Sequence, residues 1–469
     1  MKTAIWWIRR DLRLSDNQAL TEALRRAEVV VPVFILDPKL LASEYTGQAR
    51  LAFLFDGLRE LDRSLKQCGS GLILRRGDPL EVLADLVQDT NAEGIFAEED
   101  YSPYARQRDK NVALFLPLKL LPGVTVFHPK MLLKADNTPY TVFTPFSRKW
   151  RSLPASGSTI PAPEHLAAIP TLASLEVPEH PSHPAESLFK AGEQEAERKL
   201  SGFSDRAIFD YSEMRNRMDM EGTSRLSPYL RLGMLSARQA VWAAQEASQS
   251  ASTTSAQKGA ETWLNELIWR EFYAAILFHF PYVRQQAFRS ELRNIPWRND
   301  PSGLAAWKAG LTGYPVVDAA MRQLNATGWM HNRARMIAAS FLTKDLLINW
   351  QEGERYFMQQ LLDGDPASNN GGWQWTAGTG TDAAPYFRVF NPILQGLKFD
   401  PQGDYVRRWV PELALVPTKH IHTPWEMPDD LQKQVNCRID SDYPGPIVDH
   451  SLARERVLIA YRSGSAQAR

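Results

Sequence analysis

Residues 3–36 read TAIWWIRRDLRLSDNQALTEALRRAEVVVPVFIL. This stretch begins with a short apolar run at 3–8, continues through an amphipathic segment at 17–27 and returns to a second apolar run at 29–36. The alternation predicts a strand, a helix and a second strand, which is the repeating unit of a parallel sheet covered by helices. The beginning of the chain is therefore expected to form an α/β domain.

The same alternation continues to about residue 130. A helix is expected at 48–67 and another after Gly77-Asp78-Pro79, with further strands at 71–74, 94–97 and 124–128. Doubly wound parallel sheets bind ligands at the carboxyl ends of their strands. Those ends carry Arg9-Arg10-Asp11, Asp37 and Glu98-Glu99-Asp100. The sequence contains neither a G-x-G-x-x-G fingerprint nor a P-loop, so the usual dinucleotide and nucleoside triphosphate sites are not predicted.

The composition changes beyond the α/β part. Residues 152–186 are rich in Pro, Ser and Ala, which is typical of an extended connector. From about residue 190 the pattern is helical, with helices expected at 260–278, 316–324, 332–349 and 352–361 and an exposed polar loop at 245–259. We predict an α/β plus all-α protein in three parts: an α/β domain at 1–130, a connector at 131–189 and a helical domain at 190–469.

The overall composition limits the class of protein. The 469 residues exceed what a single core usually holds, and 54 Lys and Arg balance 54 Asp and Glu. A net charge of zero argues against a polybasic binder but not against a DNA enzyme, because phosphate affinity depends on a local patch. Cys68 and Cys437 cannot form a disulfide framework or a metal cluster. No apolar run has the length of a signal or membrane segment, so we expect a metal-free cytoplasmic protein.

Residues 223–228, TSRLSP, combine three hydroxyl groups and an arginine ahead of a predicted helix. Ser227 suits the N-cap and Pro228 the first helical position. The same arrangement can hold a phosphate at a helix N-terminus. An ordinary cap and a phosphate cradle both remain open from these residues alone.

Two predicted helix faces carry side chains that are unusual for a core. Trp263, Glu266, Trp269, Arg270 and Tyr273 follow helical spacing and are expected to share one face. A glutamate between tryptophans favours a face that lines a cavity. Residues 331–336, HNRARM, place an amide, guanidinium groups and a thioether on one turn, which fits either a site or a solvated face.

Residues 362–385, LDGDPASNNGGWQWTAGTGTDAAP, form the most unusual segment. It is too apolar for a flexible linker and too rich in Gly, Asn and Asp to be helical throughout. Asp363 and Asp365 can hold a polar ligand or pair with arginine, and Gly371 and Gly372 permit close backbone approach. We predict a binding site in this segment.

Four long runs carry a resemblance to a known family. Residues 369–392, NNGGWQWTAGTGTDAAPYFRVFNP, are similar to the flavin-site motif of the photolyase/cryptochrome family. The similarity extends to 313–324 (GYPVVDAAMRQL), 328–333 (GWMHNR) and 7–17 (WIRRDLRLSDN), so it covers essentially the whole chain. It implies an α/β antenna domain, a connector and a helical FAD domain.

The resemblance also implies specific contacts with FAD, which is active in its reduced form, FADH⁻. Asn369 corresponds to the asparagine that faces flavin N5, where an amide can accept or donate a hydrogen bond. The remaining residues that match the flavin pocket of the family are Tyr211, Thr223, Ser224, Arg225, Leu226, Ser227, Trp263, Arg335, Asp363 and Asp365.

A chain of tryptophans and a lesion pocket follow from the same resemblance. Trp373, Trp350 and Trp297 match the electron-transfer chain, in order from the flavin to the surface. Glu266 is expected to hydrogen-bond a flipped-out pyrimidine dimer and to steady it after electron transfer. The other residues expected to contact the DNA or its lesion are Arg215, Trp269, Arg270, Asn332, Arg333, Met336, Trp375 and Gln395.

The subclass rests on few positions. Glu266, Trp269 and Met336 resemble class I enzymes that split cyclobutane pyrimidine dimers (CPDs), whereas (6-4) photolyases have a histidine near Met336. The resemblance thus implies light-driven dimer repair in UV-damaged DNA by a monomer of the cytoplasm, nucleoid-associated when bound. The alternatives are a blue-light photoreceptor of the cryptochrome type, a (6-4) enzyme and, in a different class, a flavin oxidoreductase.

A second, light-harvesting chromophore is also implied. Folate-binding members carry an Asn-Glu pair after the fourth strand, where this sequence has Tyr104-Ala105. A deazaflavin of the 8-HDF type is therefore favoured over folate (MTHF). The candidate contacts are Asp37, Arg50, Asp100 and Arg108.

Overall fold

The computed structural model describes residues 1–154, 159–180, 188–385 and 387–466. Two compact units divide the chain, and each consists of several segments. The first unit comprises Met1–Ser212, Thr223–Pro281 and Leu362–Ala367. The second comprises Glu213–Gly222, Tyr282–Leu361 and Ser368–Arg469. The predicted class, α/β followed by all-α, is confirmed.

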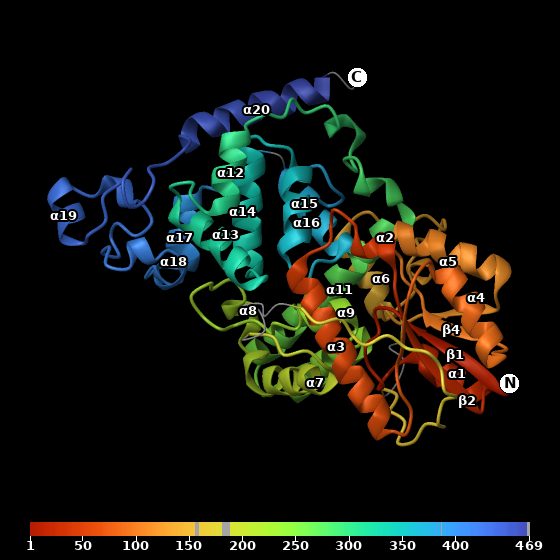
Figure 1. Ribbon diagram of the computed structural model, residues 1–469. Helices are drawn as coiled ribbons and strands as arrows, with labels where there is room; N and C mark the ends of the chain where they lie inside the picture. The colour runs from red at the N-terminus through yellow and green to blue at the C-terminus, as the bar shows by residue number, and fades with distance from the viewer. Residues whose placement is uncertain (155–158, 181–187, 386, 467–469) are drawn as a thin grey trace. The chain divides into compact units, whose positions relative to one another are not determined.

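A five-stranded parallel sheet in the order β3-β2-β1-β4-β5 organises the first unit. Its central strand β1 pairs with β2 and β4, so the point where the strand order reverses lies between β1 and β4. Figure 1 shows β1, β2 and β4 side by side in the red and orange part of the chain. The strands are β1 (Thr3–Ile8), β2 (Val29–Leu36), β3 (Ile73–Arg76), β4 (Ile95–Glu98) and β5 (Leu118–Leu121).

Helices cover both faces of this sheet. Ile5 and Trp7 of β1 point to one face and pack with Leu83 and Leu86 of α4. The helix α1 packs against β1 and β4 and buries Leu20. The helices of this unit up to the connector are α1 (Gln18–Arg26), α2 (Pro38–Leu41), α3 (Gln48–Gln67), α4 (Pro79–Thr90), α5 (Pro103–Phe115) and α6 (Phe143–Ser152), with a 3₁₀ turn at Pro129–Met131.

The last predicted strand, 124–128, is wrong. The fifth strand is Leu118–Leu121, and residues 124–128 have no strand structure. The backbone N–H groups of Val126 and Phe127 instead donate to the carboxylate of Glu271, at 2.6 and 3.4 Å. A side chain 145 residues away thus takes the amides that a sheet ladder would need.

Within the predicted connector, residues 159–180 have no regular secondary structure, as expected, whereas residues 143–152 form the helix α6. Two backbone hydrogen bonds hold residues 159–180 against the rest of the first unit. The Leu166 N–H donates to the Cys68 carbonyl oxygen at 2.7 Å, and the Leu175 N–H donates to the Leu74 carbonyl oxygen at 2.9 Å. The remaining connector residues, 155–158 and 181–187, lie outside the described part. After the connector come α7 (Glu193–Gly202), a π-helix at Phe203–Ala207, α8 (Tyr211–Met214), α9 (Ser227–Leu232), α10 (Ala237–Ser250) and α11 (Thr254–His279).

The expected exposed loop at 245–259 is largely helical. The helix α10 continues to Ser250, and α11 begins at Thr254, fewer than two turns before residue 260, where the apolar pattern becomes clear. Thr253 caps α11 by accepting a hydrogen bond from the Ala256 N–H at 3.1 Å. The polar composition concealed a helix end and a helix start whose caps are themselves polar.

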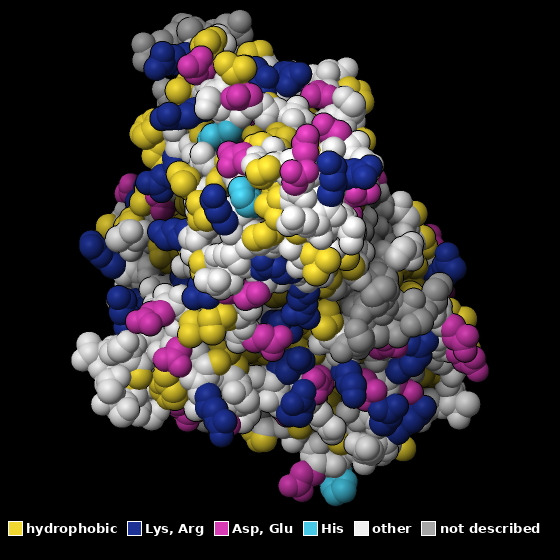
Figure 2. Space-filling model, turned by 90° about the vertical axis from the view of Figure 1, so that its left-hand side faces the viewer, with side chains coloured by type: hydrophobic (Ala, Val, Ile, Leu, Met, Phe, Trp, Pro, Cys, Tyr) yellow, Lys and Arg dark blue, Asp and Glu magenta, His cyan; other side chains and the backbone are white. Residues whose placement is uncertain are grey.

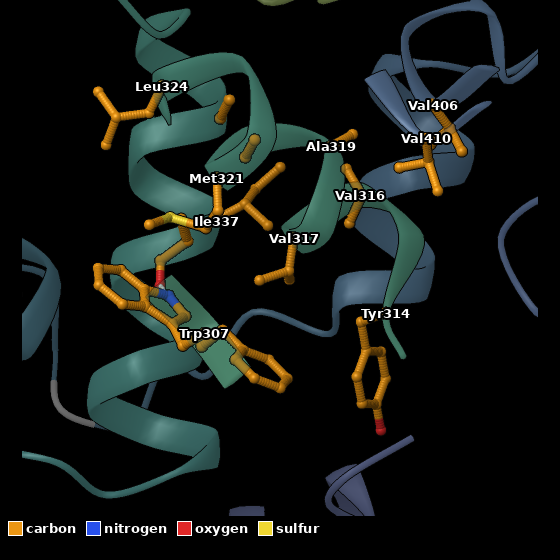
Figure 3. Close-up of a cluster of buried hydrophobic side chains, with 14 of the residues drawn as sticks. Trp307, Tyr314, Val316, Val317, Ala319, Met321, Leu324, Ile337, Val406 and Val410 are labelled. Atoms are coloured by element: carbon orange, nitrogen blue, oxygen red, sulfur yellow. Dashed lines mark hydrogen bonds between the residues drawn. The ribbon is translucent and has the colours of Figure 1, made fainter. Parts of the chain in front are cut away.

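Fourteen buried side chains at the centre of the second unit are drawn in Figure 3. Val317 and Met321 of α13 point toward Ile337 of α14 and Trp307 of α12 (Figure 3). The helices of this unit are α12 (Pro301–Ala309), α13 (Pro315–Thr327), α14 (Asn332–Ser340), α15 (Trp350–Gln360), α16 (Pro366–Ala377), α17 (Pro392–Phe399), α18 (Asp404–Trp409), α19 (Asp429–Gln434) and α20 (His450–Ala466). Short 3₁₀ turns lie at Pro281–Arg284, Ser290–Leu292, Pro411–Leu413 and Pro424–Glu426.

The predicted helix 332–349 is shorter and irregular. The helix α14 ends at Ser340, and Phe341–Asp345 form a π-helical turn. Leu347 then has a left-handed backbone with φ of 56°. Lys344 and Asp345 are fully buried in this turn, so the chain departs from α-helical geometry where it must satisfy two buried charges.

Both signs of charge occur on the surface of the molecule. Lys and Arg side chains are interspersed with Asp and Glu over the face shown in Figure 2, which fits the net charge of zero. Among the described residues, no helix combines the length and apolarity required to cross a bilayer.

Candidate functional site

Buried arginines and aspartates meet at the carboxyl ends of β1 and β4, in the first unit. Arg10 donates to Asp365 at 2.8 Å and to Asp100 at 3.4 Å. Arg10, Asp100 and Asp365 line one pocket together with Arg270. We call Arg10, Arg50, Arg231, Arg270, Asp100, Asp363 and Asp365 the ionic cluster. Sequence reasoning expected ligands at these strand ends but gave no role to Arg10 or Arg231.

The ionic cluster has perturbed protonation equilibria. Burial and the proximity of Arg10 lower the pKa of Arg231 to about 9, and burial lowers the pKa of Arg50 to about 10. Burial by itself would raise the pKa of Asp100, but the charges of Arg10, Arg231 and Arg9 and the hydrogen bond from the Ser102 N–H together lower it to about 2. The cluster holds four cations and three anions, and the neighbouring Glu271 carboxylate also acts on Arg270.

The predicted antenna residues fall into two groups within this unit. Arg50 and Asp100 belong to the ionic cluster. Asp37 instead accepts a hydrogen bond from the Tyr104 hydroxyl, and Arg108 lies over the rings of Trp7 and Tyr104, at 4.7 and 5.9 Å from their centres. Tyr104, which stands where folate-binding members have asparagine, is thus held inside the second group.

The expected phosphate segment, 223–227, precedes α9. Ser227 is the first helical residue and is exposed, so the prediction that it caps the helix is wrong. Leu226 occupies the N-cap position and is 1% exposed, because its side chain belongs to the core. Arg225 has a left-handed backbone with φ of 52°, and the Leu226 N–H points to the Ser224 hydroxyl at 3.5 Å. With no capping side chain, the helix leaves backbone donors available for an anion.

Two of the predicted flavin contacts meet through a third aromatic ring. Tyr211 and Trp263 both pack on Phe203, with ring centres 5.9 and 5.0 Å away. Both side chains are buried in the first unit. Asp363 is buried in the same unit.

The predicted face of α11 is divided among different neighbours. Trp269 stacks on Phe143 with ring centres 3.8 Å apart and planes 5° from parallel. Arg270 donates to the carbonyl oxygens of Val124 (2.7 Å) and Leu230 (3.3 Å), which occupies it inside the unit. Glu266 is half-buried. The spacing placed these residues on one helix, but the neighbouring segments decide where each side chain points.

In the second unit, α16 presents Asn369 and Trp373 to α15. The Asn369 Nδ2 donates to the carbonyl oxygen of Glu354 at 2.9 Å. The Trp373 ring packs directly on Gly353, where an added Cβ would lie 2.0 Å from the ring. At Gly372, an added Cβ would meet nothing within 4 Å among the described residues. The Asn369 amide lies one turn of helix from this space, and the two together fit a flat polycyclic group such as the flavin ring.

The three predicted electron-transfer tryptophans differ in exposure. Trp373 and Trp350 are 2% and 3% exposed, whereas Trp297 is only partly buried. Trp297 packs edge-on against Tyr461 with ring centres 6.0 Å apart. Trp307, which sequence reasoning missed, lies 6.0 Å from Trp373 and is fully buried. Its lack of any local motif left no signal for it in the sequence.

The helix α14 carries three of the residues predicted to contact the lesion or the DNA: Asn332, Arg333 and Met336. Arg333 lies 4.4 Å above the Phe399 ring and donates to the Asn216 side chain at 2.7 Å. Burial and the nearby charge of Arg215 lower the pKa of Arg333 to about 10. The Asn332 amide lies 3.9 Å from the Met336 sulfur.

Three further predicted residues also belong to the second unit. Arg335 donates to the carbonyl oxygen of Met330 at 2.9 Å. Gln395 and Trp375 are partly exposed, in α17 and α16.

Comparison with known proteins identifies the class of protein to which this chain belongs. Residues 4–165 match the family model described as DNA photolyase, and residues 263–463 match the model described as the FAD binding domain of DNA photolyase. The fold and the matched models thus define a flavin-binding protein of the photolyase type.

The relatives extend the match over the whole chain. The deoxyribodipyrimidine photo-lyase of Escherichia coli is 40% identical over 99% of both chains, and that of Synechococcus sp. is 40% identical over 97% of this chain and 96% of its own. The chain therefore belongs to the DNA photolyase family.

Solved structures agree with this assignment. A bacterial class III photolyase from Agrobacterium tumefaciens has a TM-score of 0.93 at 38% identity, covering 99% of this chain and 98% of its own. A Synechocystis sp. cryptochrome has a TM-score of 0.90 at 31% identity, covering 98% and 99%. An archaeal photolyase from Sulfolobus tokodaii with two FAD molecules has a TM-score of 0.84 at 32% identity, covering 98% and 100%.

Proposed function

We propose that this enzyme repairs cyclobutane pyrimidine dimers in UV-damaged DNA, driven by light. The observation that carries the proposal is the 40% identity over nearly the full length to relatives named deoxyribodipyrimidine photo-lyase. Met336, where (6-4) enzymes are expected to carry histidine, supports the dimer as the substrate. The class I assignment stays a prediction, because one similar structure is that of a bacterial class III photolyase.

Contacts with the flavin are proposed in each of the two units separately. Thr223, Ser224 and Arg225 supply hydroxyl groups and a charge for the phosphates, and the first turn of α9 supplies backbone N–H groups. Asn369 and Trp373 border the ring. Bound and reduced, FAD supplies the electron that light transfers to the dimer. The other proposed contacts are Tyr211, Leu226, Ser227, Trp263, Arg335, Asp363 and Asp365.

The proposed lesion contacts combine stacking with charge. Trp269 and Trp375 offer aromatic faces to the pyrimidines, and such stacking contributes about 1–3 kcal/mol per base. Arg215 and Arg333 hold the backbone, with Gln395. The dimer must leave the helix, at a cost of a few kcal/mol that is smaller for damaged bases; photolyases are themselves an example of this principle. Arg270 is the weakest of these proposals, because its guanidinium already binds two carbonyl oxygens.

Glu266 can be tested separately from the cofactor. We expect Glu266→Ala to lower the repair yield per photon more than the FAD content, because it removes the hydrogen bond that steadies the reduced dimer. Absorbance at the flavin bands and repair per absorbed photon measure the two. Equal losses of both would assign Glu266 to the structure of the unit.

Reduced protein provides the decisive experiment for the reaction. Purified, chemically reduced enzyme is mixed with UV-damaged oligothymidine, and the base absorbance is followed in near-UV light and in darkness. We expect recovery only in the light. The same measurement with a (6-4) lesion distinguishes the rival enzyme. Failure on both, in protein shown to hold reduced FAD and to bind the DNA, would favour a photoreceptor.

We also propose a deazaflavin antenna, a monomer and the three-part organisation 1–130, 131–189 and 190–469. In the proposed antenna site, Arg50 and Asp100, with Arg10, supply one charged group of side chains. Asp37 and Arg108 supply a second group, in which they contact the rings of Tyr104 and Trp7. Reconstitution with 8-HDF or MTHF, followed by the excitation spectrum of repair, tests the chromophore. Arg108→Met should weaken deazaflavin binding but leave FAD content unchanged, because Arg108 contacts Trp7, Tyr104 and Asp109 and none of the proposed FAD contacts.

A further inference from the structure

The amide of Asn369 is held from one side by a single residue. Its Nδ2 donates to the backbone carbonyl oxygen of Glu354 at 2.9 Å, and the side chain also hydrogen-bonds the Glu354 carboxylate. Carbonyl and carboxylate oxygens only accept hydrogen bonds, so the amide nitrogen must face Glu354. The amide oxygen of Asn369 is consequently turned away from α15.

Glu354 is itself fixed by an ion pair. Its carboxylate accepts a hydrogen bond from Arg284 at 2.6 Å, and its side chain is only 3% exposed. Burial raises the pKa of Glu354, and Arg284 opposes that rise by favouring the carboxylate. The neighbouring Val283 carbonyl accepts from Asn370 and Gln374 of α16, each at 3.0 Å. The segment before α12 therefore ties α15 and α16 together on both sides of Asn369.

One turn of α15 locates two functional side chains. Gly353 bears the Trp373 ring, and the next residue, Glu354, bears the Asn369 amide. Asn369 and Trp373 are four residues apart in α16 and lie on one face of that helix. A displacement of Glu354 would therefore alter the orientation of the amide without changing which residue faces the ligand.

We propose that Glu354, held by Arg284, is a positioning residue that fixes Asn369 with its amide oxygen toward the flavin and thereby favours the protonated one-electron-reduced form of that flavin. This inference rests on the proposed placement of Asn369 beside flavin N5. An acceptor that faces a ring N–H stabilises the protonated form, whereas a donor stabilises the unprotonated one. Glu354 and Arg284 act only through Asn369.

The test compares two ion pairs of the second unit. Arg284→Met/Glu354→Met removes the carboxylate without leaving a buried guanidinium unpaired, and Glu354→Gln preserves the shape and one acceptor. Glu412→Gln is the control, because it breaks the Arg322–Glu412 pair (2.7 Å), which is remote in sequence from Asn369. Each full-length holoprotein is illuminated anaerobically without DNA, in the presence of an external thiol that supplies the electron. The visible spectrum then gives the fractions of protonated and unprotonated one-electron-reduced flavin from pH 6 to 10.

We expect the pH midpoint between the two forms to fall by about one unit in the double variant, a tenfold loss of proton affinity. Glu354→Gln should shift it in the same direction by less, and Glu412→Gln should leave it unchanged. An unchanged midpoint at normal FAD content, or an equal shift in the control, would overturn the proposal. If the double variant does not fold, the shift in Glu354→Gln decides.

The outcome is separable from the proposed repair reaction. Wild-type protein that fails to repair dimers but shows the shift in the variants would contradict the proposed function and support the positioning role. Wild-type protein that repairs dimers while the variants show no shift would do the reverse.

Discussion

The two units bury charge in different ways. In the first unit, Arg13 pairs with Glu98 at 2.7 Å, and both side chains are 2% exposed. In the second unit, Lys344 is fully buried, donates to the Ala377 carbonyl oxygen at 2.7 Å and lies 3.9 Å from the centre of the Tyr461 ring. Arg13 thus has an opposite charge as its partner, as Arg284 has in the second unit, whereas Lys344 has only a carbonyl oxygen and an aromatic face among the contacts described.

This difference matches the two tasks proposed for the units. A charged interior suits the recognition of polar chromophores and phosphates, because fixed charges orient such groups. An aromatic interior, in which Trp373 contacts Trp307 and Phe357, suits electron transfer because indole rings oxidise readily and need no proton. Each of the following predictions changes one side of the comparison.

The largest effect is expected at the exposed end of the aromatic path. Trp297→Phe should abolish light-driven reduction of oxidised FAD while sparing repair by chemically reduced enzyme. Trp409→Phe is the matched control, since Trp409 is also partly buried against the same core. Flavin absorbance under illumination with an external reductant measures both. Normal photoreduction in Trp297→Phe would remove this residue from the chain.

Breaking the ionic pair of the first unit should cost more stability than breaking a surface pair. Arg13→Met leaves the Glu98 carboxylate buried without its partner, which costs about 3–5 kcal/mol. Arg63→Met breaks an exposed pair with Glu60 and should cost less than about 1 kcal/mol. Urea unfolding followed by circular dichroism gives both free energies. Equal costs would mean that burial does not distinguish the pairs.

A smaller loss is expected from crowding the aromatic core. Gly353→Ala would place a Cβ 2.0 Å from the Trp373 ring, and overpacking of this kind costs about 1–3 kcal/mol. Gly202→Ala in α7 meets nothing within 4 Å and should instead stabilise by about 0.5–1 kcal/mol. The urea midpoint reports both changes, and the rate of FAD photoreduction should fall only in Gly353→Ala. A neutral Gly353→Ala would contradict the close packing of Trp373.

The pH dependence of stability should have opposite signs in the two units. Burial raises the pKa of Glu98 to about 7, so the folded state binds a proton more tightly than the unfolded state, and stability falls as pH rises toward 7. Burial lowers the pKa of Lys344 to about 7, so stability should rise with pH between 7 and 10. Each contributes at most about 1.4 kcal/mol per pH unit.

Substitutions isolate these two contributions. Glu98→Gln should remove the decline below pH 7, and Lys344→Met should remove the rise above it. The free energy of unfolding, measured in urea from pH 5 to 9, tests both. A decline that persists in Glu98→Gln would assign it to another buried carboxyl group.

Local patterns predicted much of the fold because they act within a few residues. The strand–helix alternation of 3–36 and the helices near 316–324 and 352–361 appear in the structure with small shifts in their ends. The polar run 245–259 misled the prediction because the same residue types cap helices and fill loops. The strand expected at 124–128 failed because Glu271 takes its backbone amides.

The features of the candidate site also fall into those that the sequence predicted and those that only the tertiary structure revealed. The sequence by itself determined the family and the residue types of the proposed flavin and lesion sites, because long motifs such as 369–392 are specific without any contact information. Only the tertiary structure decided that Glu354 holds Asn369, that Gly353 bears Trp373 and that Arg13 meets Glu98. Such pairs join residues 15 to 85 positions apart, and their geometry depends on the path of the chain and the burial of every intervening element rather than on local preference.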